Sequence, residues 1–157
     1  MGVDKALADH CTFLKFMYAA APISGKLNTH VIDFDDKGDT TVTGLTAKES
    51  DCHTMGAMHG SLYFKMLDDA AFFASQARET ECFVLTVSFN TIIMRPVLPG
   101  TELIAKGVVT SNSKSLIVAD SQLYTGDGKL VATGSGTFMK QPKLAIGDFK
   151  KKLNYEK

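Results

Sequence analysis

One acidic residue lies in the middle of a strongly apolar segment of the sequence. Asp68 is followed by Asp69, and the neighbours of this pair are Met66, Leu67, Ala70, Ala71, Phe72 and Phe73. Burying an ionised carboxylate is costly unless it is paired or protonated, so the position needs a reason. Burial also raises the pKa of a carboxyl, which makes it a better base for activating water near neutral pH. Asp68 is therefore a candidate base; the alternative is that one of the two acids faces solvent or caps a neighbouring loop.

The elements that hold this acid follow from the periodicity of apolar residues. Helical spacing of apolar side chains predicts an N-terminal helix over about residues 4–21, which ends before Pro22. Residues 59–79 predict a longer helix that is apolar nearly all round and should therefore be enclosed. β-Branched and aromatic runs predict six strands: Thr29–Phe34, Thr40–Leu45, Cys82–Met94, Glu102–Thr110, Leu116–Tyr124 and Leu130–Met139.

The order of these elements favours an α+β fold in a single domain over residues 1–157. Short connections such as Leu98-Pro99-Gly100 predict that the last four strands form an antiparallel meander. A curved sheet of about six strands wrapped around one long central helix accounts for the order. One helix cannot cover both faces and the edges of such a sheet, so we expect self-association. The lysine-rich residues 141–157 are expected to form a flexible basic tail.

The composition is that of an ordinary globular protein, with 45% hydrophobic and 22% charged residues. The 17 Lys and Arg residues balance 17 Asp and Glu residues, which gives no indication of a nucleic-acid partner. No apolar stretch reaches the roughly 18 residues of a membrane span, and no apolar run is typical of a secretory signal. Cys11, Cys52 and Cys82 are an odd number at unrelated spacings without a zinc pattern, so we expect reduced thiols, no metal site and a cytoplasmic location.

Motifs along the predicted central helix and the last strands resemble those of a known family. Met58-His59-Gly60-Ser61 opens the helix, and Asp68 in Leu67-Asp68-Asp69-Ala70 follows His59 by nine residues. With the closing Gly134-Ser135-Gly136-Thr137-Phe138, residues 40 to 140 resemble the PaaI-type (phenylacetyl-CoA thioesterase-like) branch of the hotdog-fold thioesterases. The resemblance implies the hotdog fold and hydrolysis of acyl-CoA or related thioesters without metal or organic cofactor. It also implies homodimers that usually pair as dimers of dimers.

The resemblance assigns the two central roles to Asp68 and Gly60. Asp68 would be the catalytic carboxylate, acting as base or as nucleophile, and the Gly60 N–H would bind the thioester carbonyl. The first turn of a helix has unpaired N–H groups at a positive dipole end, and glycine lets a carbonyl approach the backbone closely. The alternative for Gly60 is a tight turn without a binding role.

Five further residues are candidates through the same resemblance. Thr86 falls where relatives place a Ser or Thr that orients water, and His53 stands where they often have an Asn or Gln that contacts the substrate carbonyl. His59 is expected to orient the turn that opens the helix. Ser61 replaces the second glycine of the family motif and, with Asp69, is a candidate for substrate binding.

The spacing of Gly60 and Asp68 predicts a site between subunits. Eight residues separate them, which is about 12 Å along a helix axis. A nucleophile or base must come within about 3 Å of the reacting thioester carbonyl, whose oxygen is bound by the Gly60 N–H. The two groups of one chain therefore cannot serve one thioester. Two antiparallel central helices related by a twofold axis would bring Gly60 of one chain beside Asp68 of the partner subunit.

The phosphates of CoA call for cations and loop amides. Arg95 and the predicted turn Ser111-Asn112-Ser113-Lys114 supply candidates, chiefly Arg95, Ser113 and Lys114; the alternative is that these are ordinary solvated side chains. Two other functions stay open at this point: a non-catalytic acyl-CoA-binding protein of the same fold, and a hotdog hydratase or dehydratase.

Overall fold

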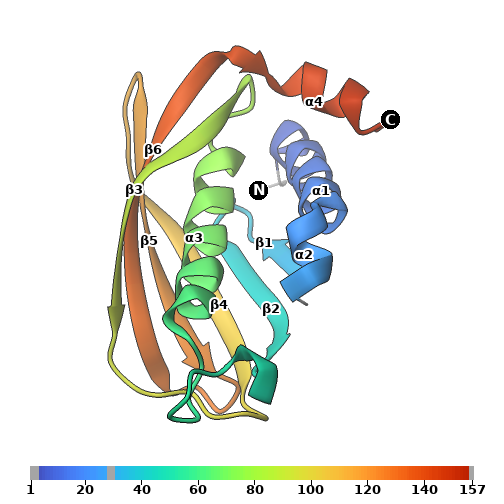
Figure 1. Cartoon of the computed structure of the whole chain (residues 1–157). Helices are drawn as coiled ribbons and strands as arrows, with labels where there is room; N and C mark the ends of the chain where they lie inside the picture. The colour runs from blue at the N-terminus through green and yellow to red at the C-terminus, as the bar shows by residue number, and fades with distance from the viewer. Residues whose placement is uncertain (1–3, 28–30, 156–157) are drawn as a thin grey trace.

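The computed structural model describes residues 4–27 and 31–155, which form a curved six-stranded antiparallel sheet around a central helix (Figure 1). The α+β architecture with an N-terminal helix is confirmed. The elements are α1 Lys5–Ala20, α2 Pro22–Leu27, β1 Val31–Phe34, β2 Thr40–Thr46, a 3-10 turn Glu49–Asp51, α3 Gly60–Ala77, β3 Cys82–Ile93, β4 Glu102–Asn112, β5 Leu116–Thr125, β6 Leu130–Ala145 and α4 Ile146–Lys152. Of the predicted first strand, residues 29 and 30 lie outside the described residues.

The strand order is β1-β2-β4-β5-β6-β3, with every neighbouring pair antiparallel. The predicted meander is right for β4, β5 and β6 and wrong for β3, which pairs with β6 at the edge of the sheet. The connection 94–101 is the reason, because its eight residues can reach up to about 27 Å. Three strand spacings, about 14 Å, are enough to pass from β3 to β4. A short connection therefore does not require neighbouring strands here.

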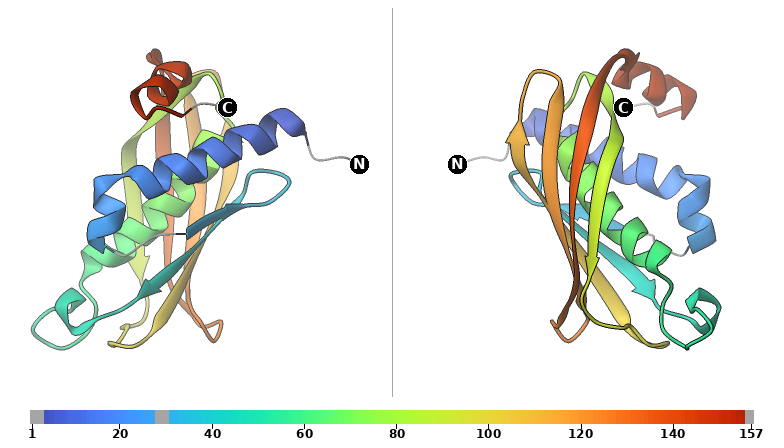
Figure 2. Two further views of the ribbon diagram at one scale, coloured as in Figure 1. Left: turned by 90° about the vertical axis from the view of Figure 1, so that its right-hand side faces the viewer. Right: turned by 60° about the vertical axis from the view of Figure 1, so that its left-hand side comes forward.

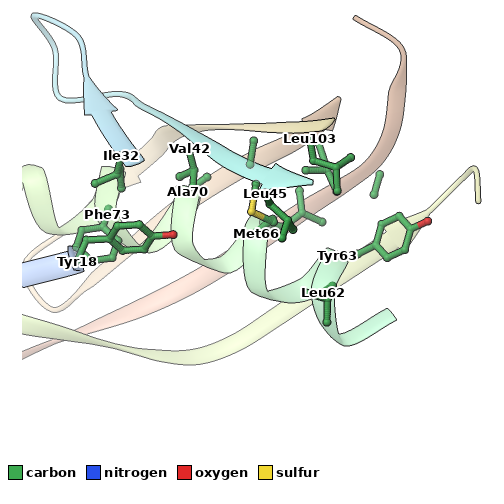
Figure 3. Packing of buried hydrophobic residues seen from close by; sticks show 14 of the residues in the cluster. Tyr18, Ile32, Val42, Leu45, Leu62, Tyr63, Met66, Ala70, Phe73 and Leu103 are labelled. Atoms are coloured by element: carbon green, nitrogen blue, oxygen red, sulfur yellow. The ribbon is translucent and has the colours of Figure 1, made fainter. Parts of the chain in front are cut away.

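The apolar side of α3 packs into the concave face of the sheet. Figure 3 shows Met66 and Ala70 of this helix with Leu45 and Leu103 from the strands. A Cβ atom at Gly107 of β4 would lie 2.1 Å from the carbonyl oxygen of Ala70, so only glycine permits this close approach. Neither α3 nor any other helix in the described residues is long and apolar enough to cross a membrane.

The N-terminal helix α1 lies across α3 on the side away from the sheet (Figure 2). The rings of Tyr18 and Phe73 meet edge to face at 5.2 Å, and His10 Nε2 lies 2.9 Å from the carbonyl oxygen of Gln76. The helix ends at Ala20, one residue before the predicted end, and Pro22 opens α2 because proline is tolerated at a first helical position, where no intrahelical N–H bond is lost.

Residues 141–155 are not the loose end that the lysines suggested. β6 continues to Ala145, and α4 then packs against the body of the protein. The ring of Phe149 stacks on Phe83 at 4.8 Å, and the ring of Tyr155 lies 5.0 Å from that of Phe13. Ile146 and Phe149 have the spacing of residues on one face of a helix, but the lysines around them make this apolar pattern easy to overlook in the sequence.

Candidate active site

Asp68 lies on α3 and faces β3, where Thr86 Oγ1 donates a hydrogen bond of 3.2 Å to its Oδ1. The two residues are eighteen positions apart in the sequence and are brought together by the packing of α3 on the sheet. Burial, and then the charge of Asp69, raise the pKa of Asp68 to about 6, although the Thr86 bond and the Lys65 ammonium oppose the rise. The carboxyl is therefore ionised at neutral pH and basic enough to take a proton from water.

Asp69 points toward α1 instead of β3. Its Oδ2 accepts a 3.1 Å hydrogen bond from the Tyr18 hydroxyl and forms an ion pair with Lys65. Burial raises the pKa of Asp69, and the partners Lys65 and Tyr18 pull it back. The structure thus separates Asp69 from the side of α3 that holds Asp68, and it gives no support to a contact between Asp69 and substrate.

His59 is the N-cap of α3 and not a free base. Its Nδ1 accepts a 3.2 Å hydrogen bond from the Ser61 backbone N–H and lies 2.8 Å from Ser61 Oγ. The Leu62 N–H donates to the His59 carbonyl at 3.0 Å. Since the first residue of a helix has no intrahelical acceptor for its N–H, the amide of Gly60 is the one left for another group. His59 and Ser61 both serve the turn that presents this amide.

A hollow of about 400 Å³ opens beside Gly60. His53 lines it from the loop before α3, and the Met55 N–H donates to its Nδ1 at 3.1 Å. With Nδ1 as acceptor the neutral imidazole carries its proton on Nε2, which makes this nitrogen a donor. An Asn or Gln amide would offer the same kind of group. The lining residues are His53, Ala57, Met58, Gly60, Tyr63, Ile93, Met94, Arg95 and Pro96.

Within one chain, the candidate residues fall into two separate groups. Gly60 and Asp68 are about 12 Å apart along α3, and the hollow beside Gly60 does not include Asp68. Arg95 belongs to the Gly60 group: its N–H bonds the Val131 carbonyl at 3.2 Å, and its Nε donates to the Leu130 carbonyl at 3.0 Å.

Ser113 and Lys114 belong to the β4–β5 turn, which is level with Thr86 along the strands but separated from β3 by β6. Thr86 is paired across β6 and β5 with the residues that close the β4–β5 turn. This turn and the start of α3 stand at opposite ends of the molecule in Figure 1. Lys114 is exposed, and Ser113 Oγ donates to the Leu116 carbonyl at 2.9 Å. One chain therefore does not gather Arg95 and Lys114 around a single phosphate.

An aromatic pair between the two groups was missed in the sequence. Phe64 is four residues from both Gly60 and Asp68 and so shares their side of α3. Its side chain is 42% exposed, and its ring meets that of Phe89 edge to face at 5.4 Å. A Cβ at Gly134 or Gly136 would lie 2.6 Å from the Phe89 ring, so these glycines make room for it. The spacing of four residues between positions 60, 64 and 68 could have indicated from the sequence that Phe64 shares the side of Gly60 and Asp68.

No group of three or more His, Cys, Asp or Glu side chains in residues 4–27 and 31–155 is arranged to hold a metal ion. All three cysteines are free thiols. The candidate groups are thus a carboxylate with a hydroxyl, and a helix-opening amide with an imidazole donor; between them they can activate water and polarise a carbonyl.

The model of one family, described as "Thioesterase superfamily", matches residues 55–132, from the loop before α3 into β6. These residues belong to the thioesterase superfamily. The sheet wrapped around α3 is the hotdog fold that the sequence predicted, and solved thioesterases of this fold superpose on it.

Two solved structures are similar over most of the chain. The PaaI protein from the phenylacetic acid degradation operon of E. coli has a TM-score of 0.77 at 20% identity and covers 89% of this chain and 96% of its own. A putative thioesterase from Ralstonia eutropha JMP134, related to phenylacetic acid degradation, has a TM-score of 0.71 at 24% identity and covers 83% and 98%.

A third similar structure is a hypothetical thioesterase from Streptococcus pneumoniae TIGR4 with coenzyme A. It has a TM-score of 0.64 at 17% identity and covers 71% of this chain and 84% of its own. No match was found among curated proteins. At these identities the structural likeness establishes the fold, while the activity of this chain is inferred from its own residues.

Proposed function

We propose that the protein hydrolyses an acyl-CoA thioester to a free acid and CoA, at sites formed between two subunits. The observation that carries the proposal is the half-buried Asp68 carboxylate, hydrogen-bonded to Thr86 and with a pKa raised to about 6, on the same side of α3 as the Gly60 amide. The match to the superfamily and the similar thioesterase that holds coenzyme A support the same substrate class.

In the proposed reaction, the Gly60 N–H and the His53 Nε2–H bind the thioester carbonyl oxygen. Asp68 of the partner subunit takes a proton from a water molecule that Thr86 helps to orient, and the resulting hydroxide attacks the carbonyl carbon. The tetrahedral intermediate then expels the CoA thiolate, which takes up the proton held by the carboxyl. In the alternative route Asp68 attacks the carbonyl directly, and water hydrolyses the mixed anhydride.

The position of β3 at the edge of the sheet supports the proposed pairing of subunits. Large apolar side chains are exposed along this strand, Val87 at 50%, Ile92 at 53% and Ile93 at 47%, and a second copy would remove them from water. A twofold axis that puts Gly60 beside Asp68 of the partner subunit also puts Phe64, midway between them, next to the partner's Phe64.

The same axis brings Arg95 of one chain and Lys114 of the partner subunit to the same end of the dimer. It moves the partner's Lys114 toward Arg95 at the Gly60 end, where the CoA phosphates would be held. By the family resemblance, two such dimers pair into a tetramer. We also propose that the protein works in the cytoplasm, where its three free cysteines stay reduced.

The test is to incubate the purified protein with aromatic and aliphatic acyl-CoAs and a thiol reagent. We expect CoA release with at least one of them, and no turnover by Asp68→Asn, which keeps the shape of the side chain but cannot take the proton. Tight binding of acyl-CoA without release would identify a binding protein instead. Hydration of an enoyl-CoA would identify a hydratase, and near-normal release by Asp68→Asn would refute the role of this carboxylate.

A further inference from the structure

A buried cluster of polar side chains lies directly behind Asp68, on the side of α3 that faces α1. Lys65 and Asp69 form an ion pair, and their side chains are only 16% and 12% exposed. The Tyr18 hydroxyl donates to Asp69 at 3.1 Å, and the Lys65 ammonium lies 5.5 Å from the centre of the Tyr18 ring. The cation of Lys65 and the anion of Asp69 thus lie one helical turn apart, and both contact Tyr18 of α1.

This cluster depends on the N-terminal helix, which lies outside the region that matches the superfamily model. Tyr18 is 2% exposed and is fixed in turn by its edge-to-face contact with Phe73. A buried ion pair contributes little to stability compared with apolar side chains of the same size. The position of this ion pair next to the candidate catalytic carboxylate of Asp68 therefore suggests a role other than stability.

The charges of the cluster act on Asp68 with opposite signs. Asp69 raises the pKa of the Asp68 carboxyl and Lys65 lowers it. The hydrogen bond from Thr86 of β3 also lowers the pKa of Asp68, while Lys65 of α3 and Tyr18 of α1 lower the pKa of Asp69. If Asp69 stood alone, the repulsion of a second carboxylate would favour a protonated, inactive Asp68; if Lys65 stood alone, it would make Asp68 a weaker base.

We propose that Lys65, Asp69 and Tyr18 are positioning residues that balance the charge behind Asp68 and so set the pH range in which this carboxylate is a base. The inference rests on the function proposed above for Asp68. It gives α1 a part in the reaction, because α1 contributes Tyr18, whose hydroxyl bonds Asp69 of the ion pair.

The test is a two-step substitution read by carbon NMR of the aspartate carboxyl groups, which reports the titration midpoint of Asp68 whether or not the variant turns over substrate. Asp69→Asn removes the negative neighbour and should shift the Asp68 midpoint to lower pH. Adding Lys65→Met in that background removes the positive neighbour and should shift the midpoint back to higher pH. Because Asp69 is already neutral there, neither variant leaves an unpaired buried carboxylate.

Two further variants and a pH–rate profile complete the test. Tyr18→Phe removes one donor from Asp69 and should raise the Asp69 midpoint, whereas Lys151→Met on the exposed face of α4 should leave both midpoints in place. The acid side of the kcat/KM profile should move with the Asp68 midpoint in each variant. Shifts in the same direction in both steps, or no shift in either, would overturn the proposal. A wild-type protein without thioesterase activity would instead refute the proposed function, while the NMR shifts would still decide the charge balance.

Discussion

Asp68 carries a cost in the folded protein as well as a proposed use. Its pKa rises from 3.8 to about 6 on folding, mainly because burial disfavours the charge. Because the folded state binds this proton more tightly than the unfolded state, the protonated carboxyl stabilises the fold fully at pH values below 3.8, the pKa of the unfolded chain. This stabilisation is lost as the pH rises through about 6. Above that pH the folded chain holds an anion that the unfolded chain would hydrate better.

At the scale of this residue, Asp68→Asn should therefore stabilise the protein at pH 8 while it abolishes turnover. The free energy of unfolding should rise by about 1–3 kcal/mol at pH 8, since each unit of pKa shift corresponds to about 1.4 kcal/mol. At pH 4 wild type and variant should differ little. Urea unfolding at the two pH values measures the difference, and equal effects at both would contradict a raised pKa.

Gly60 offers a second test that changes a single hydrogen-bond donor. Gly60→Pro removes the N–H at a first helical position, where proline is favoured, and His59 before it already has the extended ψ of 141° that proline requires. Gly60→Ala keeps the N–H, and its Cβ would make an ordinary 3.5 Å contact with Ile93. We expect kcat of Gly60→Pro to fall by roughly 10²–10³-fold and that of Gly60→Ala to stay within a few-fold. Equal losses in both would argue against an oxyanion role for this amide.

At the scale of elements, the ends of the chain close over the top of α3. α4 brings Phe149 onto Phe83, α1 brings Tyr18 onto Phe73, and Tyr155 lies between the two ends against Phe13. These rings join the terminal helices to the same core that holds α3. The helices at the ends are thus part of the support of the candidate site.

Phe149→Ala should consequently lower the free energy of unfolding by about 1–3 kcal/mol, because a half-buried aromatic ring is lost from the core. Lys152→Ala, at an exposed position of α4, should change it by less than about 0.5 kcal/mol. Urea unfolding measures both. Equal, small effects in the two variants would mean that α4 is only loosely held, as the lysine content first suggested.

At the scale of the whole molecule, the mechanism proposed above uses two chains for one site, because Gly60 and Asp68 of one chain lie about 12 Å apart along α3. Gly60→Pro and Asp68→Asn chains should each be inactive alone, and mixed subunits should regain activity. A mixed dimer has one site with both groups intact, so random mixing in equal amounts should restore about a quarter of the wild-type rate. Co-expression with two different affinity tags provides the measurement: mixed dimers purified through both tags should show about half of the wild-type rate. A mixture that stays inactive despite forming mixed dimers would show that each site belongs to one chain.

Local sequence predicted α1, α3 and the six strands, although not α2 and α4, because the spacing of apolar side chains reports directly which face of a long element is buried. The central helix was predicted as 59–79 and runs over Gly60–Ala77, and the strands match within a few residues except where β6 runs on to Ala145. The chemical candidates were equally visible, since an acid in an apolar helix and a glycine at its start are features of residue type and position.

Only the tertiary structure decided which of these elements and residues meet. The position of β3 beside β6 depends on the path of residues 94–101 across the end of the sheet, which no periodicity encodes. The contact of Tyr18 with Asp69 joins residues 51 positions apart. It follows from the direction in which α1 crosses α3, a result of the packing of whole elements, whereas the pattern along each element reports only its own buried face.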